Sequence, residues 1–226
     1  MARQPRLFLP EFPQLVLLQA LPGMNAFESR DHYLRFIALL EWHARETQTA
    51  IHAYALWSKG ALLLLGTPDA AAAGKLVQGI NRVYVPWRCH GGHLWQPRFK
   101  STAVQPGLWS LRAALWVDAA PVRLGVSQDA AMYPFCSFAG HTGVTQDRLL
   151  THLPVYFSLG NTPFDQQMAF RQLAEQGIGE AASLRLQEGL SKGWLVCDEQ
   201  QVAHLQQSSE RPLIPRPRGR PRREKT

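Results

Sequence analysis

The hydrophobic positions along the chain change their spacing several times. Short apolar runs have the length of strands, and longer stretches carry apolar residues at helical spacing. The tight turn Ser58-Lys59-Gly60 separates two of the short runs, which predicts a β-hairpin. The pattern predicts strands at 14–19, 51–57, 61–65 and 99–104, and helices at 32–47, 70–85, 108–119, 164–175, 179–191 and 198–207.

The first seven of these elements follow the order β-α-β-β-α-β-α, which is typical of an α+β fold of the ferredoxin-like type. We expect an antiparallel sheet with helices on one face and an open face that can meet a nucleic acid strand. Residues 86–92 are expected to form a loop after the second helix. The predicted organisation is a domain at 1–140, a helical accessory segment at 141–207 and a basic tail at 208–226.

Positive charge is segregated along the chain. The net charge is +7, yet residues 70–117 contain six Lys and Arg and no acidic residue. Residues 208–226 contain seven Lys and Arg against two Glu. Two basic blocks in an otherwise mildly acidic protein are typical of a protein that binds a polyanionic partner. A basic surface kept for solubility is the alternative.

Composition excludes several other classes of protein. Hydrophobic residues make up 46% of the chain, which is enough for a packed core. The three cysteines are widely spaced and imply no disulfide framework. Pro10, Glu11 and Pro13 interrupt the early apolar stretch, and no run approaches the roughly 18 apolar residues of a membrane span. We therefore expect a cytoplasmic protein without a membrane partner.

The tail contains an Arg-Gly-Arg-Pro core within basic flanks, which is typical of an AT-hook. Pro and Gly keep such a backbone narrow and extended, so its arginines can enter the minor groove of A·T-rich DNA. A nonspecific phosphate-binding tail and an RNA-binding segment are the alternatives. The candidate contacts in the tail are Arg216, Arg218, Arg220 and Arg222.

A second candidate interface mixes aromatic and cationic residues between positions 82 and 100. Aromatic rings can stack on unpaired bases while cations bind phosphates. Trp95 or Trp87 is a candidate for stacking, although Trp95 and Phe99 also suit a core position at a loop–strand junction. The candidate contacts are Arg82, Arg88, Trp95, Gln96, Arg98 and Lys100.

Three sequence blocks resemble those of a known family. Residues 92–104 read GHLWQPRFKSTAV, residues 119–126 read AAPVRLGV, and residues 133–138 read YPFCSF. In this order they resemble the REP-associated tyrosine transposases, members of the HUH single-tyrosine superfamily. That family has a G-x-L-W-Q-x-R-F-K block, then N-P-V-x-x-G, then Y-P-W-S-S-[YF]. The resemblance spans most of residues 1–140 and implies binding of DNA hairpins with single-stranded flanks.

The resemblance also implies a cleavage chemistry for which this chain lacks the residues. Family members hold a divalent metal such as magnesium with an H-x-H pair, and a helical tyrosine attacks the scissile phosphate. Aligned on the shared blocks, the H-x-H pair falls on Gly60 and Leu62, the nucleophile on Trp116 and a metal-assisting Asn on Ala120. We expect these four residues to lie together as an apolar pocket, with no catalytic residue and no metal or other cofactor.

Other residues with chemical potential are interpreted as structural or surface residues. Cys89, His90 and His93 are too few for a convincing zinc site. Asp118 is interpreted as a surface charge on the former catalytic helix. The isolated histidines, which have no ligand partner nearby in sequence, are His43, His52, His141, His152 and His204.

The sequence thus predicts a transposase-like protein that binds hairpin or single-stranded DNA without cleaving it. RNA is an alternative partner, and a homodimer is an alternative to a monomer. Two other functions stay open. One is an active transposase with a relocated nucleophile such as Tyr84 or Tyr133, and the other is a protein-interaction module on the same scaffold.

Overall fold

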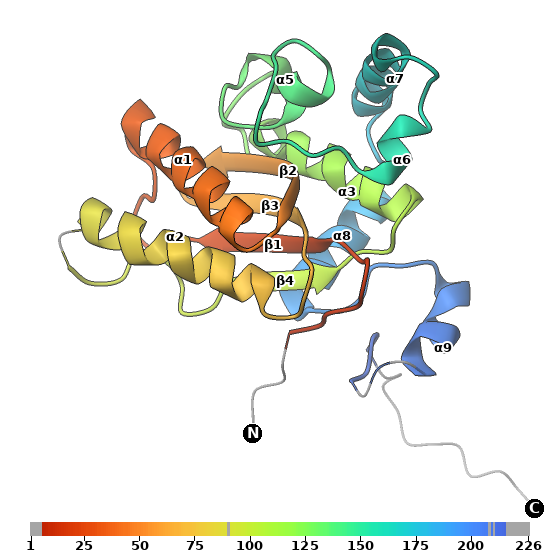
Figure 1. The fold of residues 1–226 in the computed structure, drawn as a ribbon, viewed down its shortest axis with the longest axis horizontal. Coiled ribbons are helices and arrows are strands. Elements are labelled where there is room, and N and C mark those ends of the chain that lie inside the picture. Colours follow the sequence, from red (N-terminus) through yellow and green to blue (C-terminus); the bar gives the residue numbers. More distant parts are fainter. Residues whose placement is uncertain (1–5, 90, 208, 210, 216–226) are drawn as a thin grey trace, which may run out of the picture.

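The computed structural model describes residues 6–89, 91–207, 209 and 211–215. Its N-terminal half has the predicted order of strands and helices (Figure 1). The elements of this half are β1 (Gln14–Gln19), α1 (Arg30–Glu46), β2 (Ala50–Trp57), β3 (Gly60–Gly66), α2 (Ala72–Cys89), β4 (Lys100–Ala103), α3 (Leu108–Asp118) and α4 (Ala120–Arg123).

The four strands form one antiparallel sheet in the order β2-β3-β1-β4. Trp57 pairs with Gly60 across the turn, so the β2–β3 hairpin is confirmed. Central strand β1 pairs Leu17 with Leu62 on one side and with Lys100 on the other. The predicted α+β class with an antiparallel sheet is therefore confirmed, and β4 lies at one edge of the sheet.

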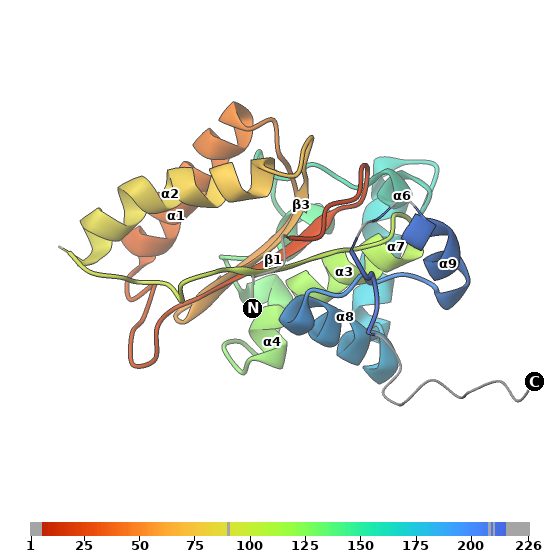
Figure 2. The same cartoon turned by 90° about the horizontal axis from the view of Figure 1, so that it is seen from below.

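Both faces of the sheet are covered. Figure 2 shows α1 and α2 on one side of the strands and α3, α4 and α8 (Glu180–Lys192) on the other. Val16 and Leu63 pack with the first pair of helices, whereas Leu15, Leu62 and Leu64 pack with α3. The expectation that one face of the sheet is open is therefore wrong. The interior residues of β2 and β3 are buried on both faces, and such strands need a cover on each side.

Residues beyond 140 supply much of the second cover. Phe170 of α7 (Pro163–Gln176) and Leu186 and Leu190 of α8 belong to the same buried cluster as Leu62 and α3. The domain boundary after residue 140 stays a prediction. The remaining short elements are a 3₁₀ turn (Ala130–Met132), α5 (Phe138–His141), α6 (Pro154–Phe157) and α9 (Glu199–Gln207).

Helix α2 extends further than predicted, because it continues through Pro86 to Cys89. A proline removes one backbone donor from a helix, but tertiary contacts hold this last turn in place. The Tyr84 hydroxyl donates to the Ala26 carbonyl over 2.9 Å, and the Arg88 guanidinium donates to the Asn25 carbonyl over 3.0 Å. The expectation of a loop is therefore wrong for residues 86–89.

The chain returns to the body of the protein after α9. Leu213 is fully buried in a small cluster with Leu7, Leu9 and Leu195, and the Leu195 amide donates to the Leu213 carbonyl over 2.9 Å. This anchor lies three residues before the predicted AT-hook arginines. Within the described part of the chain, no helix is both long and apolar enough to cross a membrane. Arg216, Arg218, Arg220 and Arg222 lie outside the described residues.

Candidate nucleic-acid interface

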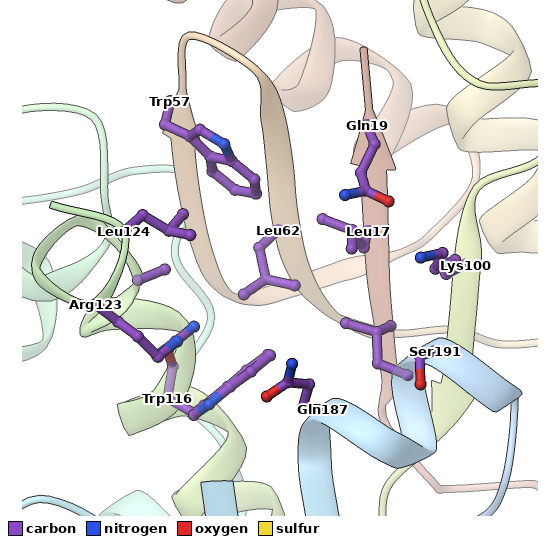
Figure 3. Close-up of a pocket in the computed structure, with 12 residues that line it drawn as sticks. Leu17, Gln19, Trp57, Leu62, Lys100, Trp116, Arg123, Leu124, Gln187 and Ser191 are labelled. Atoms are coloured by element: carbon purple, nitrogen blue, oxygen red, sulfur yellow. The ribbon is translucent and has the colours of Figure 1, made fainter. Parts of the chain in front are cut away.

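A pocket of about 350 Å³ lies between the sheet and the helices of its second face (Figure 3). It brings together three of the four positions that align with the family's catalytic residues, namely Leu62 from β3, Trp116 from α3 and Ala120 from α4. We call it the indole pocket, after the rings of Trp57 and Trp116. Its lining is completed by Leu17, Gln19, Lys100, Arg123, Leu124, Gln187, Leu190 and Ser191.

Gly60 lies beside this pocket but does not line it, because the Trp57 ring packs on Gly60 across the hairpin. A Cβ atom at position 60 would lie 2.5 Å from the Leu18 carbonyl oxygen and 2.8 Å from a carbon of the Trp57 ring. Real Cβ atoms do not approach other atoms this closely, and the backbone of β1 cannot move cheaply. A side chain at position 60 is therefore incompatible with this packing, in which the Trp57 ring occupies the space beside Gly60.

The residues of the indole pocket do not fit a divalent metal. Among its described lining residues, only Gln19, Gln187 and Ser191 offer side-chain oxygens, and all three are neutral. Hard divalent cations in proteins are usually held by carboxylates. Lys100 and Arg123 also place positive charge at the pocket, which opposes cation binding.

The two tyrosines considered as relocated nucleophiles lie elsewhere. Tyr84 is fully buried and donates to the Ala26 carbonyl, and the Tyr133 hydroxyl donates to the Leu56 carbonyl over 2.6 Å. Burial raises the pKa of both hydroxyls well above the ordinary tyrosine value, which disfavours the nucleophilic phenolate. Neither side chain lines the indole pocket.

Arg123 places a positive charge beside the Trp116 indole. Its guanidinium carbon lies 4.0 Å from the centre of the indole ring, and its Nη1 donates to the Trp116 carbonyl over 2.7 Å. Partial desolvation lowers the pKa of Arg123 to about 10, so the group stays cationic at neutral pH. The Trp116 Nε1 donates to Ser183 Oγ over 2.9 Å, and these contacts together hold the orientation of the indole.

A second hollow of about 590 Å³ runs along edge strand β4 and the end of α8. We call it the basic groove, because its lining includes Arg6, Arg98, Lys100, Lys192 and Arg211 and, within the described residues, no acidic side chain. Burial and then the nearby charge of Arg98 lower the pKa of Arg211. The two hollows are neighbours, since Lys100, Leu190 and Ser191 line both.

Backbone and aromatic contacts position two of these cations. Arg211 Nη2 donates to the Gly193 carbonyl over 2.5 Å at the end of α8. The Arg6 guanidinium carbon lies 3.6 Å from the centre of the Phe99 ring, a cation–π contact that holds the N-terminal segment against β4. The groove thus assembles cations from positions 6, 98–100, 192 and 211, which the sequence does not place together.

Apart from Arg88 and Trp95, the sequence-predicted contacts fall into three groups. Gln96, Arg98 and Lys100 line the basic groove. Arg82 is exposed on α2, on the opposite side of the sheet from α8. The four tail arginines lie outside the described residues.

Two predicted contacts require correction. Arg88 is mostly buried, pairs with Glu28 at 2.6 Å and donates to backbone carbonyls of residues 25 and 26, so it ties α2 to the loop after β1. Trp95 is only 8% exposed and packs against Phe27 and Phe36. The core position that the sequence left open for Trp95 is therefore the correct alternative, and stacking of this ring on bases is not.

Asp118 is also unlike its sequence-based interpretation. It is 1% exposed, and its two carboxylate oxygens contact Ser137 Oγ at 2.5 Å and His141 Nδ1 at 2.7 Å. Ser137 in turn bonds both backbone groups of Tyr54 in β2. This buried network joins α3, β2 and the segment 137–141. The Asp118 carboxylate lies between the Ser137 hydroxyl and the His141 imidazole and contacts both.

Metal ligands do not gather elsewhere in the described part of the chain. Within it, no group of three or more His, Cys, Asp or Glu is arranged to hold a metal ion. His90, one of the three residues weighed for a zinc site, lies outside the described residues.

Comparisons with known proteins agree with this fold at a distance. No protein-family model and no curated protein sequence matches the chain. A solved structure of a REP-associated tyrosine transposase bound to a REP hairpin is similar in fold, with a TM-score of 0.53 and 14% sequence identity. The match covers 68% of this chain and 99% of that one. At this identity the similarity shows the fold alone. The chain therefore has a fold that is distantly similar to that of the transposase.

Proposed function

We propose that this protein binds a DNA hairpin with a single-stranded flank through the basic groove, and that it does so without cutting the DNA. The observation that carries the proposal is the groove itself. Five cationic side chains from separate parts of the chain converge along the edge of the sheet. Clustered positive charge of this kind binds phosphates by releasing their counterions.

The fold supports DNA as the partner. The transposase with a similar fold is described as bound to a REP hairpin. In this chain the blocks that resemble that family include Gln96, Arg98 and Lys100, which all line the basic groove. The residues that carry the resemblance therefore also contribute part of the positive charge of the basic groove.

The absence of cleavage is proposed from the residues of the indole pocket. Leu62, Trp116 and Ala120 offer neither a metal ligand nor a nucleophilic oxygen, and Gly60 has no room for a side chain. Incubating labelled hairpin DNA with the protein and magnesium or manganese should yield neither a nick nor a covalent protein–DNA adduct. An adduct would overturn this half of the proposal.

The binding half is tested by charge-matched double variants. Arg98→Ala/Lys100→Ala removes two charges from the groove. Arg45→Ala/Arg171→Ala removes two exposed charges on α1 and α7, each of which pairs with a Glu four residues away in sequence. Hairpin affinity is measured by fluorescence anisotropy at several salt concentrations.

The groove variant should weaken binding and reduce the slope of log K against log salt by about 1.4 to 1.8, because each phosphate contact contributes about 0.7 to 0.9. The control variant should keep most of the affinity and slope. Equal effects of the two double variants would show that only net charge matters and would contradict a groove site. No affinity for hairpin DNA at moderate salt would favour the protein-interaction alternative, and preference for RNA of the same sequence would change the partner.

A further inference from the structure

The indole pocket has the chemistry of a site for a planar heteroaromatic ring. The Trp57 and Trp116 rings, with Leu17, Leu62 and Leu190, supply apolar surface (Figure 3). Its volume of about 350 Å³ lies at the lower end of the range for small-molecule sites. The contacts of Trp116 with Ser183 and Arg123 hold that indole in a fixed orientation before any ligand arrives.

Polar groups at the pocket suit a nucleobase better than an aliphatic ligand. Gln19 and Gln187 each carry an amide that both donates and accepts hydrogen bonds, as the edge of a base does. Lys100 and Arg123 add two cations, and no described lining residue is acidic. An anionic ligand with a planar, hydrogen-bonding ring is complementary to this arrangement.

The position of the pocket connects it to a polynucleotide. Lys100, Leu190 and Ser191 belong to both the indole pocket and the basic groove. A strand whose phosphates follow the groove therefore passes the mouth of the pocket. Single-stranded DNA can turn one base out of its stack at a modest cost, whereas a paired base cannot leave its helix as easily.

We infer that the indole pocket receives one unstacked base from the single-stranded flank of the DNA that lies in the basic groove. The inference rests on the proposed function and specifies which part of that ligand enters the former catalytic position. The partly exposed Trp57 contacts the ring, and the buried Trp116, which is only 7% exposed, forms part of the pocket wall. The amides of Gln19 and Gln187 bond the edge of the base, and Lys100 and Arg123 face the adjacent phosphates. The pocket thus reads a base where the resemblance implies that relatives cut a phosphodiester.

The test combines two changes. Abasic nucleotides are scanned along the flank of the DNA, and the pocket of the protein is blocked by a substitution. Each flank nucleotide in turn is replaced by an abasic analogue, and affinity for the hairpin is measured. Gln187→Trp places a large ring at the pocket from an exposed position of α8, so the core is left intact. Leu184→Trp is the matched control, because Leu184 is exposed on the same helix and lines neither the pocket nor the groove. Gln187→Ala tests the amide with no added bulk.

In the wild-type protein, loss of the base at one flank position should weaken binding by about 5- to 150-fold. This range corresponds to the binding free energy of one base stacked on an aromatic side chain. Gln187→Trp should bind the intact flank as weakly as wild type binds the abasic one, and abasic DNA should cause no further loss. Gln187→Ala should bind the intact flank more weakly than wild type. Leu184→Trp should reproduce the wild-type scan.

Two results would overturn the inference, and they differ. If the hairpin binds through the groove but no flank position depends on the pocket, the pocket does not hold a base while the proposed function stands. If the same abasic loss persists in Gln187→Trp, the base is read elsewhere. Failure of every hairpin to bind would remove the proposed function together with the inference.

Discussion

Replacing Asp118 with alanine should destabilise the protein strongly, because this carboxylate is buried between two partners. The substitution leaves the His141 imidazole without its contact at 2.7 Å and the Ser137 hydroxyl without its contact at 2.5 Å. Both partners are almost fully buried, so water cannot replace the lost bonds.

The magnitude follows from burial. Each buried partner left without this acceptor costs about 1.5–2.5 kcal/mol, so the variant should lose about 3–5 kcal/mol. A protein of this kind has a total stability of about 5–15 kcal/mol, so the variant would lose a large fraction of it. Glu188→Ala is the control, because its pair with Lys192 at 3.0 Å is exposed and is worth about 0–1 kcal/mol.

Urea denaturation followed by circular dichroism measures the difference. With a slope of about 2–3 kcal/mol per molar urea, Asp118→Ala should lower the midpoint by about 1–2 M, and Glu188→Ala by less than about 0.5 M. Equal midpoints for Asp118→Ala and the control would refute the reasoning, since the buried network would then contribute no more than a surface ion pair. Asp118→Asn should fall between the two, because it keeps a side-chain oxygen for Ser137.

Three further outcomes are expected. Burial lowers the pKa of His52, so the neutral ring is favoured in the fold; stability from this group is present above pH about 6.5 and is lost as pH falls below it. A His52→Gln variant should show a smaller loss of melting temperature between pH 7 and pH 5 than wild type, and an equal loss would count against this cause. Arg88→Ala should lower the melting temperature, because it removes the ion pair between Arg88 and Glu28. Under conditions in which the variant is fully folded, its affinity for hairpin DNA should stay within about twofold of wild type. A large loss of affinity in the folded variant would restore Arg88 as a DNA contact. Deleting 216–226, which keeps the Leu213 anchor, should preserve the fold and flatten the salt slope of DNA binding, and an unchanged slope would exclude a role for the tail arginines.

Much of the fold could be predicted from local sequence. β1 has its predicted bounds, and the other predicted strands and helices lie within a few residues of theirs, since their apolar spacing and turn residues act over short distances. The extension of α2 past Pro86 could not be predicted, because contacts of Tyr84 and Arg88 with the loop after β1 decide it. The covering of the second sheet face depends on α8, which lies far along the chain from the strands that it covers.

The candidate site divides in the same way. Alignment of short blocks selected Leu62, Trp116 and Ala120, and the structure places all three on one pocket. It could not indicate Trp57, whose ring occupies the space beside Gly60, or Arg123, which lies over the Trp116 indole. Arg88 and Trp95 looked like ligand contacts because their residue types suit nucleic acid, yet burial decides whether such groups meet a ligand or the core.

The sequence by itself determined the order of elements, the segregation of positive charge and the residue types at positions 60, 62, 116 and 120. Only the tertiary structure decided which cations lie together, because Arg6, Lys100, Lys192 and Arg211 are far apart along the chain and meet at the edge formed by β4 and α8. It also decided that Asp118 is buried rather than exposed. The physical reason is range. Hydrophobic spacing and turn chemistry act between near neighbours in sequence, whereas burial and electrostatic potential depend on which distant segments pack side by side.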